Sequence, residues 1–201
     1  MKERPILFSA PMVRALIAGQ KTQTRRVAIK TSQPDRVVLS DFDAGEHKIE
    51  IENLNCGNRY WKLCPYGVPG DRLWVREAWA HDAESVEQCR AAHQDAMGGN
   101  TFGPYYRATE SAPDTLHWKP SIHMPRWASR ILLEIIGVRV EKLQDISEAD
   151  AQAEGVSNSL HMPGGRFANE NYAHLWWTIN GDGSWEANPW VWVIEFKVVK
   201  P

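Results

Sequence analysis

The chain has few features that would tie it to a membrane, a disulfide framework or a structural metal. Its 201 residues include only three cysteines, and none of them forms a C-x-x-C pair. We therefore expect no structural zinc site and a reduced, cytoplasmic environment. The sequence has no long apolar run and no N-terminal signal pattern, which argues against a membrane-spanning or exported protein. A formal net charge of −2 disfavours a protein whose whole surface binds nucleic acid.

Apolar residues and tryptophan are abundant. Hydrophobic residues make up 43% of the chain, enough for a real core. Ten residues are tryptophan, spread from Trp61 to Trp192. They are interpreted either as core packing in a small β-rich domain or, for one or two of them, as flat faces for a stacked base.

The order of patterns along the chain predicts an α+β fold with a β-rich core and short helices. A first helix is expected between Ser9 and Gly19. Ser9 suits the N-cap position, Pro11 suits the first turn, and Gly19 suits the residue that follows the helix end. Residues 82–104 have few large apolar groups and are expected to form a surface insertion or a partly mobile loop. Strands are expected over 36–52 (a hairpin turning at 43–46), 72–80, 130–143 and 190–199, and further helices from Ser147 to Gly155 and over 167–179.

A dense polar cluster, residues 19–26, follows the first predicted helix. Lys21 can act as a general base only if its pKa lies far below about 10.4, and the charges of Arg25 and Arg26 favour such a shift. In an extended strand Lys21 and Thr24 would lie on opposite faces, about 10 Å apart. A threonine nucleophile activated by this lysine therefore requires a turn here. The alternative is a solvated, basic helix exit.

Glu154 is the candidate for the group that carries a proton to a leaving group. It ends the short helix predicted after Ser147, immediately before Gly155. The helix macrodipole disfavours a carboxylate at this end, so Glu154 needs a compensating cation, and Lys21 is a suitable one. The alternative is a solvated glutamate.

Four segments together resemble the ASCH-domain family. The resemblance implies a PUA-like β-barrel decorated with short helices, in a family associated with RNA and modified nucleosides. It also implies one domain over 1–201 with insertions at about 82–120 and 157–187. The four segments are 19–26, 70–73 (Gly-Asp-Arg-Leu), 145–154 (from Asp-Ile-Ser-Glu to Glu154) and 191–196 (Val-Trp-Val-Ile-Glu-Phe).

Some members of that family are small bacterial amidohydrolases that remove the acetyl group from N4-acetylcytidine. Their catalytic lysine, threonine and glutamate fall on Lys21, Thr24 and Glu154. The resemblance implies hydrolysis of an N4-acylated cytosine or cytidine, with no cofactor and no metal. Lys21 would take the proton of Thr24, Thr24 would attack the acyl carbonyl, and Glu154 would protonate the departing amine. Direct attack by water, with Thr24 bonding to the oxyanion, stays open.

Four further residues are candidates for substrate binding. Arg26 can stabilise the oxyanion or orient the pyrimidine carbonyl. Alternation along 72–80 places Glu77 among apolar residues, so it is either the partner of a buried cation or part of a pocket. Trp79 shares that face and can pack the ring or the acyl tail, whereas Arg76 lies on the opposite face.

A function of another class is an RNA-binding module, either non-catalytic or ribonucleolytic. The same basic turn would bind a phosphate while an aromatic face stacks a splayed base. The net charge favours the small-molecule substrate, and nothing in the sequence indicates a membrane or protein partner.

Overall fold

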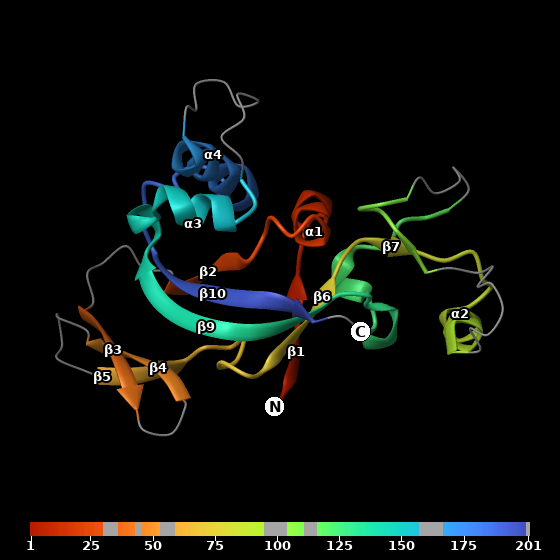
Figure 1. Cartoon of the computed structure of the whole chain (residues 1–201), viewed down its shortest axis with the longest axis horizontal. Helices are drawn as coiled ribbons and strands as arrows, with labels where there is room; N and C mark the ends of the chain where they lie inside the picture. The colour runs from red at the N-terminus through yellow and green to blue at the C-terminus, as the bar shows by residue number, and fades with distance from the viewer. Residues whose placement is uncertain are drawn as a thin grey trace.

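A computed structural model describes residues 1–29, 36–42, 46–52, 59–94, 104–110, 116–156 and 167–199 of the chain. The fold is α+β, as predicted, with an open main sheet and short helices (Figure 1). None of the helices in these residues is long and apolar enough to cross a membrane. The strands are β1 (Glu3–Leu7), β2 (Gln23–Ile29), β3 (Arg36–Phe42), β4 (Glu46–Glu52), β5 (Arg59–Leu63), β6 (Arg72–Arg76), β7 (Trp79–Ala80), β8 (Tyr105–Tyr106), β9 (Leu132–Lys142) and β10 (Trp190–Val199). The helices are α1 (Ala10–Ile17), α2 (Val86–Gln94), α3 (Glu148–Ala153) and α4 (Ala168–Asn180), with 3₁₀ turns η1 (Ser121–His123), η2 (Arg126–Ala128) and η3 (Leu143–Asp145).

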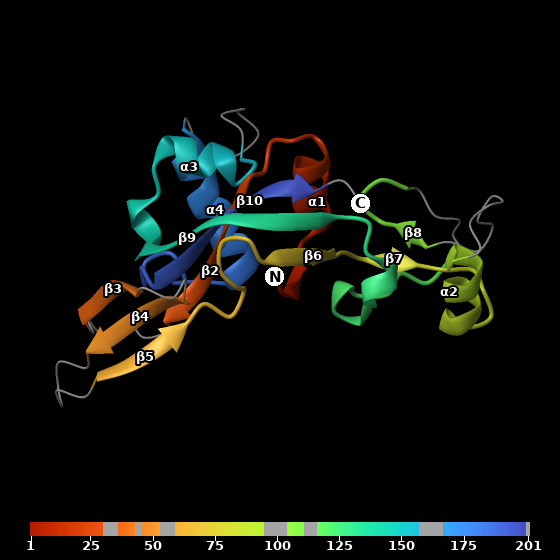
Figure 2. The ribbon, with the colours of Figure 1, turned by 60° about the horizontal axis from the view of Figure 1, so that its bottom comes forward.

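The main sheet has five strands in the order β1-β6-β9-β10-β2. β1 and β6 are parallel, and the other neighbours are antiparallel. Helices α3 and α4 lie together on one face of the long strands β9 and β10 (Figure 1). The β3-β4-β5 meander lies toward one end of the sheet, and α2 with the β7-β8 pair lies toward the other (Figure 2).

Strand β10 is apolar on both faces because both are covered. Trp192, Ile194 and Phe196 belong to the larger core cluster, with Trp190 packed against it, as the predicted alternation requires. On the opposite face, Val191 and Val193 pack with residues of α3 and α4. Burial on both faces suits the interior position of β10, between β9 and β2.

The sheet is open in the described residues, whereas the resemblance implies a closed barrel. Its edge strands β1 and β2 are not paired with each other. The Arg26 side chain spans the space between them, since its Nη2 donates to the carbonyl of Leu7 at 2.9 Å. A side-chain hydrogen bond therefore connects the two edge strands.

Local signals predict most elements well. The helix begins after Ser9 with Pro11 in its first turn, and Gly19 follows its end with φ +70°. The predicted helices α3 and α4 and strands β9 and β10 are also confirmed. The arms of the predicted 36–52 hairpin pair as β3 and β4, and residues 43–45 of its turn lie outside the described residues.

The prediction for residues 72–80 is wrong. The single strand expected over 72–80 is two strands, β6 and β7, in different sheets. The chain leaves the main sheet at Glu77, whose backbone N–H donates to the Met124 sulfur and whose carboxylate binds Arg130. The segment 82–104, expected as a surface insertion or a partly mobile loop, contains helix α2.

Candidate functional site

The site forms where the end of α3 meets the start of β2. Lys21 and Glu154 form an isolated antiparallel bridge, and the N–H of Thr22 donates to the carbonyl of Ala153 at 2.8 Å. Gly155 permits this approach, because it has φ +86° and a Cβ there would lie 2.8 Å from the Cβ of Ala15 and 3.3 Å from that of Lys21. The glycine that ends α3 thus also sets the distance between the two segments.

Lys21 is buried, with 1% of its surface exposed, and every donor of its ammonium has an acceptor. Nζ donates to the Gln23 carbonyl at 2.8 Å, the Glu154 carbonyl at 2.9 Å and Glu154 Oε2 at 2.7 Å. Burial lowers the pKa of Lys21 from its ordinary value, and this effect outweighs the opposing charge of Glu154. The lysine is therefore easier to deprotonate than an exposed one while it remains firmly positioned.

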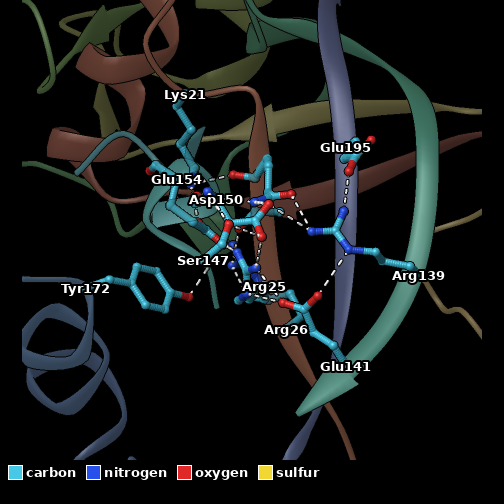
Figure 3. A network of polar contacts seen from close by, with 12 residues as sticks. Lys21, Arg25, Arg26, Arg139, Glu141, Ser147, Asp150, Glu154, Tyr172 and Glu195 are labelled. Carbon is cyan, nitrogen blue, oxygen red and sulfur yellow. Dashed lines mark hydrogen bonds and ion pairs between the residues drawn. The ribbon is translucent and has the colours of Figure 1, made fainter. Parts of the chain in front are cut away.

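The carboxylate of Glu154 is held at both oxygens (Figure 3). Oε2 accepts from Lys21, while Oε1 accepts from Arg25 Nη1 at 3.2 Å and from the Tyr172 hydroxyl at 3.5 Å. The Arg25 guanidinium also lies 5.8 Å from the centre of the Tyr172 ring. Burial raises the pKa of Tyr172 well above its ordinary value, so its hydroxyl stays a donor to the carboxylate.

A second layer of ion pairs holds Arg25 in place. Arg25 contacts Glu141 at 2.5 Å and Asp150 at 3.5 Å, and Arg139 also bonds to both of these carboxylates and to Glu195. These side chains share the face of the sheet that α3 covers (Figure 3). Such a connected network fixes the direction in which the Arg25 guanidinium points.

Thr24 is fully buried in β2 and does not bond to Lys21 in the part of the chain that the structure describes. Its Oγ1 accepts from Arg26 Nη1 at 2.6 Å, and the same nitrogen donates to the carbonyl of Arg25 at 2.8 Å. The predicted turn ends before Lys21, because β2 begins at Gln23. The structure therefore brings Lys21 and Glu154 into direct contact, whereas Thr24 bonds to Arg26 and not to Lys21.

A cavity of about 380 Å³ lies beside this cluster, within the range of small-molecule sites. Its lining includes Glu154, Arg25 and Arg26 but neither Lys21 nor Thr24. Edge strands β1 and β2 form one wall, through Leu7 and Val27 among others, and helix α4 forms the opposite wall. The opening between the unpaired strands is thus the place where the cavity forms.

Helix α4 reaches the site because α3 holds its first turn. The Glu148 carboxylate accepts from the backbone N–H groups of Ala168 at 2.7 Å and Asn169 at 3.1 Å. An acidic cap at a helix N-terminus is favourable both as a hydrogen bond and through the macrodipole. This contact places Tyr172 against Glu154.

Sequence reasoning missed Tyr172 and Glu148, and treated Arg25 only as a source of charge. Nothing local distinguishes Tyr172, which lies in a segment expected to be an insertion. Arg25 carried no clear local signal either, because its neighbours on the same strand face are Gln23, which is buried, and Val27, which is exposed.

The other predicted substrate-binding residues do not line the cavity. Glu77 has the cation partner that its buried position required, because Arg130 binds it with two hydrogen bonds of 2.9 and 3.0 Å. Trp79 is buried in a separate cluster with Tyr106 and Met124. The Arg76 guanidinium lies 4.7 Å from the centre of the Trp74 ring, and the Arg76 carbonyl accepts from the N–H of Phe8.

No group of three or more His, Cys, Asp or Glu side chains is arranged to hold a metal ion in the described ranges. No protein-family model, no curated protein and no solved structure matches the chain.

Proposed function

We propose that this protein is an amidohydrolase that cleaves the N4-acyl amide of an acylated cytosine or cytidine. The observation that carries the proposal is the buried contact between Lys21 and Glu154. Glu154 and Arg26 both line a cavity of substrate size, and Arg26 donates to the Thr24 hydroxyl behind it. A lysine of lowered pKa, a carboxylate and a hydroxyl are the groups that a covalent acyl transfer needs.

The mechanism uses each group in turn. Lys21, once neutral, accepts the proton of the Thr24 hydroxyl, and the oxygen attacks the acyl carbon to form a tetrahedral intermediate. Arg26, which already donates to Thr24 Oγ1, stabilises negative charge on the attacking oxygen and then on the oxyanion. Glu154 passes a proton from Lys21 to the departing cytosine amine, and water then hydrolyses the acyl-threonine.

Access to Thr24 requires one local movement. Arg26 lines the cavity and bonds to Thr24, so a substrate carbonyl that binds Arg26 must draw the guanidinium away from its contacts with Leu7 and Arg25. Hydrogen bonds from a charged guanidinium are stronger than neutral ones, so the substrate carbonyl must replace the contacts that Arg26 gives up.

The fold family is part of the proposal. We infer a PUA-like (ASCH) fold in which Arg26 bridges the gap between β1 and β2. Support comes from the adjacency of the segments that resemble the family: β2 pairs with β10, β10 with β9, and β9 with β6, while Glu154 lies against the start of β2.

The test follows the ultraviolet spectrum as N4-acetylcytidine and N4-acetylcytosine are converted to the free amines. Wild type and Thr24→Ser should turn over, while Thr24→Val and Glu154→Gln should lose at least about a hundredfold in kcat/KM, as expected for loss of a proton-transfer group. Thr178→Val, on the exposed face of α4, is the matched control and should keep full activity. Circular dichroism checks that each variant is folded.

Two results would overturn the proposal. One is the absence of turnover by folded wild type on any N4-acyl substrate. The other is full activity of Thr24→Val and Glu154→Gln. Salt-sensitive RNA binding that is lost in Arg26→Ala, without turnover, would instead support the RNA-binding module.

A further inference from the structure

The mouth of the cavity is lined by apolar side chains that remain in contact with water. Leu7, Val27 and Ile179 are 45%, 38% and 53% exposed, and they come from β1, β2 and α4. Met12 and Leu175 are half-buried and continue the same lining. Exposed apolar side chains from three separate elements around one opening indicate a ligand surface, because isolated ones would be scattered.

The buried part of the cavity has the opposite character. Glu154 and Arg25 are almost fully buried there, and Arg26 is half-buried. A ligand that fills the cavity must therefore present a polar, hydrogen-bonding centre to these charges and an apolar arm to the mouth. An acetyl group has a single methyl and would leave the three mouth side chains in water.

We propose that the mouth is an acyl-binding subsite, and that the preferred substrates carry an alkyl or aryl acyl group larger than acetyl. This inference rests on the proposed function, because it assigns the acyl arm of the same amide to Leu7, Val27 and Ile179. A polar ribosyl group at the mouth would place hydroxyls against these side chains, so an acylated base fits better than a nucleoside with a short acyl chain. Ser9 and Asn180 are exposed in the same lining and Ser121 is half-buried, so they offer hydrogen bonds to the polar atoms of the base.

The size of the effect follows from the apolar surface that each added group removes from water. Full burial of one methylene is worth about a fourfold gain in affinity. Because the mouth is open on one side, we expect about two- to fourfold per methylene until the opening is filled. The gain should appear mainly in KM, since the arm contacts the protein equally in the ground and transition states.

The first measurement is kcat/KM for N4-acetyl-, N4-butyryl-, N4-hexanoyl- and N4-benzoylcytosine. We expect a rise from acetyl to hexanoyl in wild type. The rise should flatten in Ile179→Ser and in Val27→Thr, both changes at exposed positions that the fold tolerates. Ile136→Ser is the matched control, because Ile136 is equally exposed at 53% but lies outside the cavity lining.

The second measurement does not depend on turnover. N4-hexylcytosine and N4-methylcytosine are amines without an acyl carbonyl, so they bind but cannot be hydrolysed. Calorimetry should give a tighter complex with the hexyl compound, and Ile179→Ser should remove the difference while Ile136→Ser keeps it.

The outcomes separate the two proposals. Absence of hydrolysis of every amide, with the chain-length dependence of binding intact, overturns the proposed function and leaves the apolar subsite standing. Equal kcat/KM for acetyl and hexanoyl substrates, or equal binding of the two amines, overturns the acyl subsite. A change of oligomeric state in Ile179→Ser by light scattering, without any change in amine binding, assigns the mouth to a protein interface and also overturns it.

Discussion

The ammonium of Lys21 lies 2.7 Å from Oε2 of Glu154, although 133 positions separate them in the chain. Both side chains are almost fully buried, at 0% and 3% exposure. Removing two charges from water is costly, and their attraction repays that cost only when the remaining hydrogen-bonding groups are also satisfied. Here the carbonyls of Gln23 and Glu154, together with Arg25 and Tyr172, satisfy them.

Breaking this pair should be strongly destabilising. Lys21→Met and Glu154→Gln should each lower the free energy of unfolding by about 3–5 kcal/mol, because each leaves a buried partner without its contact. The double variant should cost less than the sum of the two, by about 0.5–3 kcal/mol. Denaturant unfolding followed by circular dichroism measures all three.

The exposed pair of Lys197 and Glu134, at 3.0 Å, provides the control. Lys197→Met should change the free energy of unfolding by less than about 1 kcal/mol. Additive effects at Lys21 and Glu154, or a cost no larger than at Lys197, would contradict a coupled buried pair.

The pKa of Lys21 should lie below its ordinary value in the folded protein. Burial lowers it, and the carboxylate of Glu154 acts in the opposite direction. Removing that negative charge in Glu154→Gln should therefore lower the pKa further. Nitrogen NMR titration of lysine side chains, with Lys21→Arg to assign the signal, measures both values.

A change of the Lys21 pKa in the opposite direction in Glu154→Gln would also be informative. A rise of the Lys21 pKa would mean that water enters the site and that burial no longer dominates. An unshifted pKa in wild type would remove the reason for proposing Lys21 as a general base.

Acid should weaken the network through Asp150. Burial acts to raise the pKa of this carboxyl, but hydrogen bonds from Gln23 and Ser147 and the charges of Arg139 and Arg25 outweigh it and lower the pKa to about 2. A group whose folded pKa is depressed stabilises the fold above its unfolded pKa of about 4, and that stability is lost as the pH falls toward 2. The contribution is up to about 2 kcal/mol.

The comparison of wild type with Asp150→Asn checks this. The difference in free energy of unfolding between the two should be largest above pH 5 and should shrink as the pH falls from 4 toward 2. A difference that does not change over this interval would contradict the assigned pKa.

Gly155 should tolerate alanine poorly. Two effects add there: the positive φ of +86°, and the 2.8 Å approach of a Cβ to that of Ala15. Gly183 has a similar φ of +73° but no atom within 4 Å of its Cβ position. Gly183→Ala should cost about 1–2 kcal/mol from backbone strain alone, and Gly155→Ala should cost about 1–3 kcal/mol more from overpacking.

Thermal unfolding of the two alanine variants gives the difference directly. Gly155→Ala should also lower the activity on N4-acylcytosines, because it moves α3 and hence Glu154 away from Lys21. Equal costs at the two positions would mean that α3 shifts without consequence, and the close approach would then have no structural role.

Local sequence signals were sufficient for helices α1, α3 and α4 and for strands β3, β4, β9 and β10. Gly19 and Gly155 follow helix ends because a positive φ is strained for other residues. A single glycine is therefore enough to predict each of these ends. The strand 72–80 was mispredicted because its break depends on Arg130, a residue 53 positions away from Glu77. No local pattern records that contact.

The candidate site divides in the same way. The sequence by itself determined that Glu154 ends a helix and needs a cation, and that Lys21 is followed by a hydroxyl and two guanidiniums, since these follow from neighbouring residue types. Only the tertiary structure decided that Lys21 meets Glu154, that Thr24 bonds to Arg26 instead of Lys21, and that α4 closes the cavity. The physical reason is that these contacts depend on the packing of α3 and α4 against β2 and β10. This packing joins residues far apart in the chain, so the spacing of residue types along the sequence does not predict it.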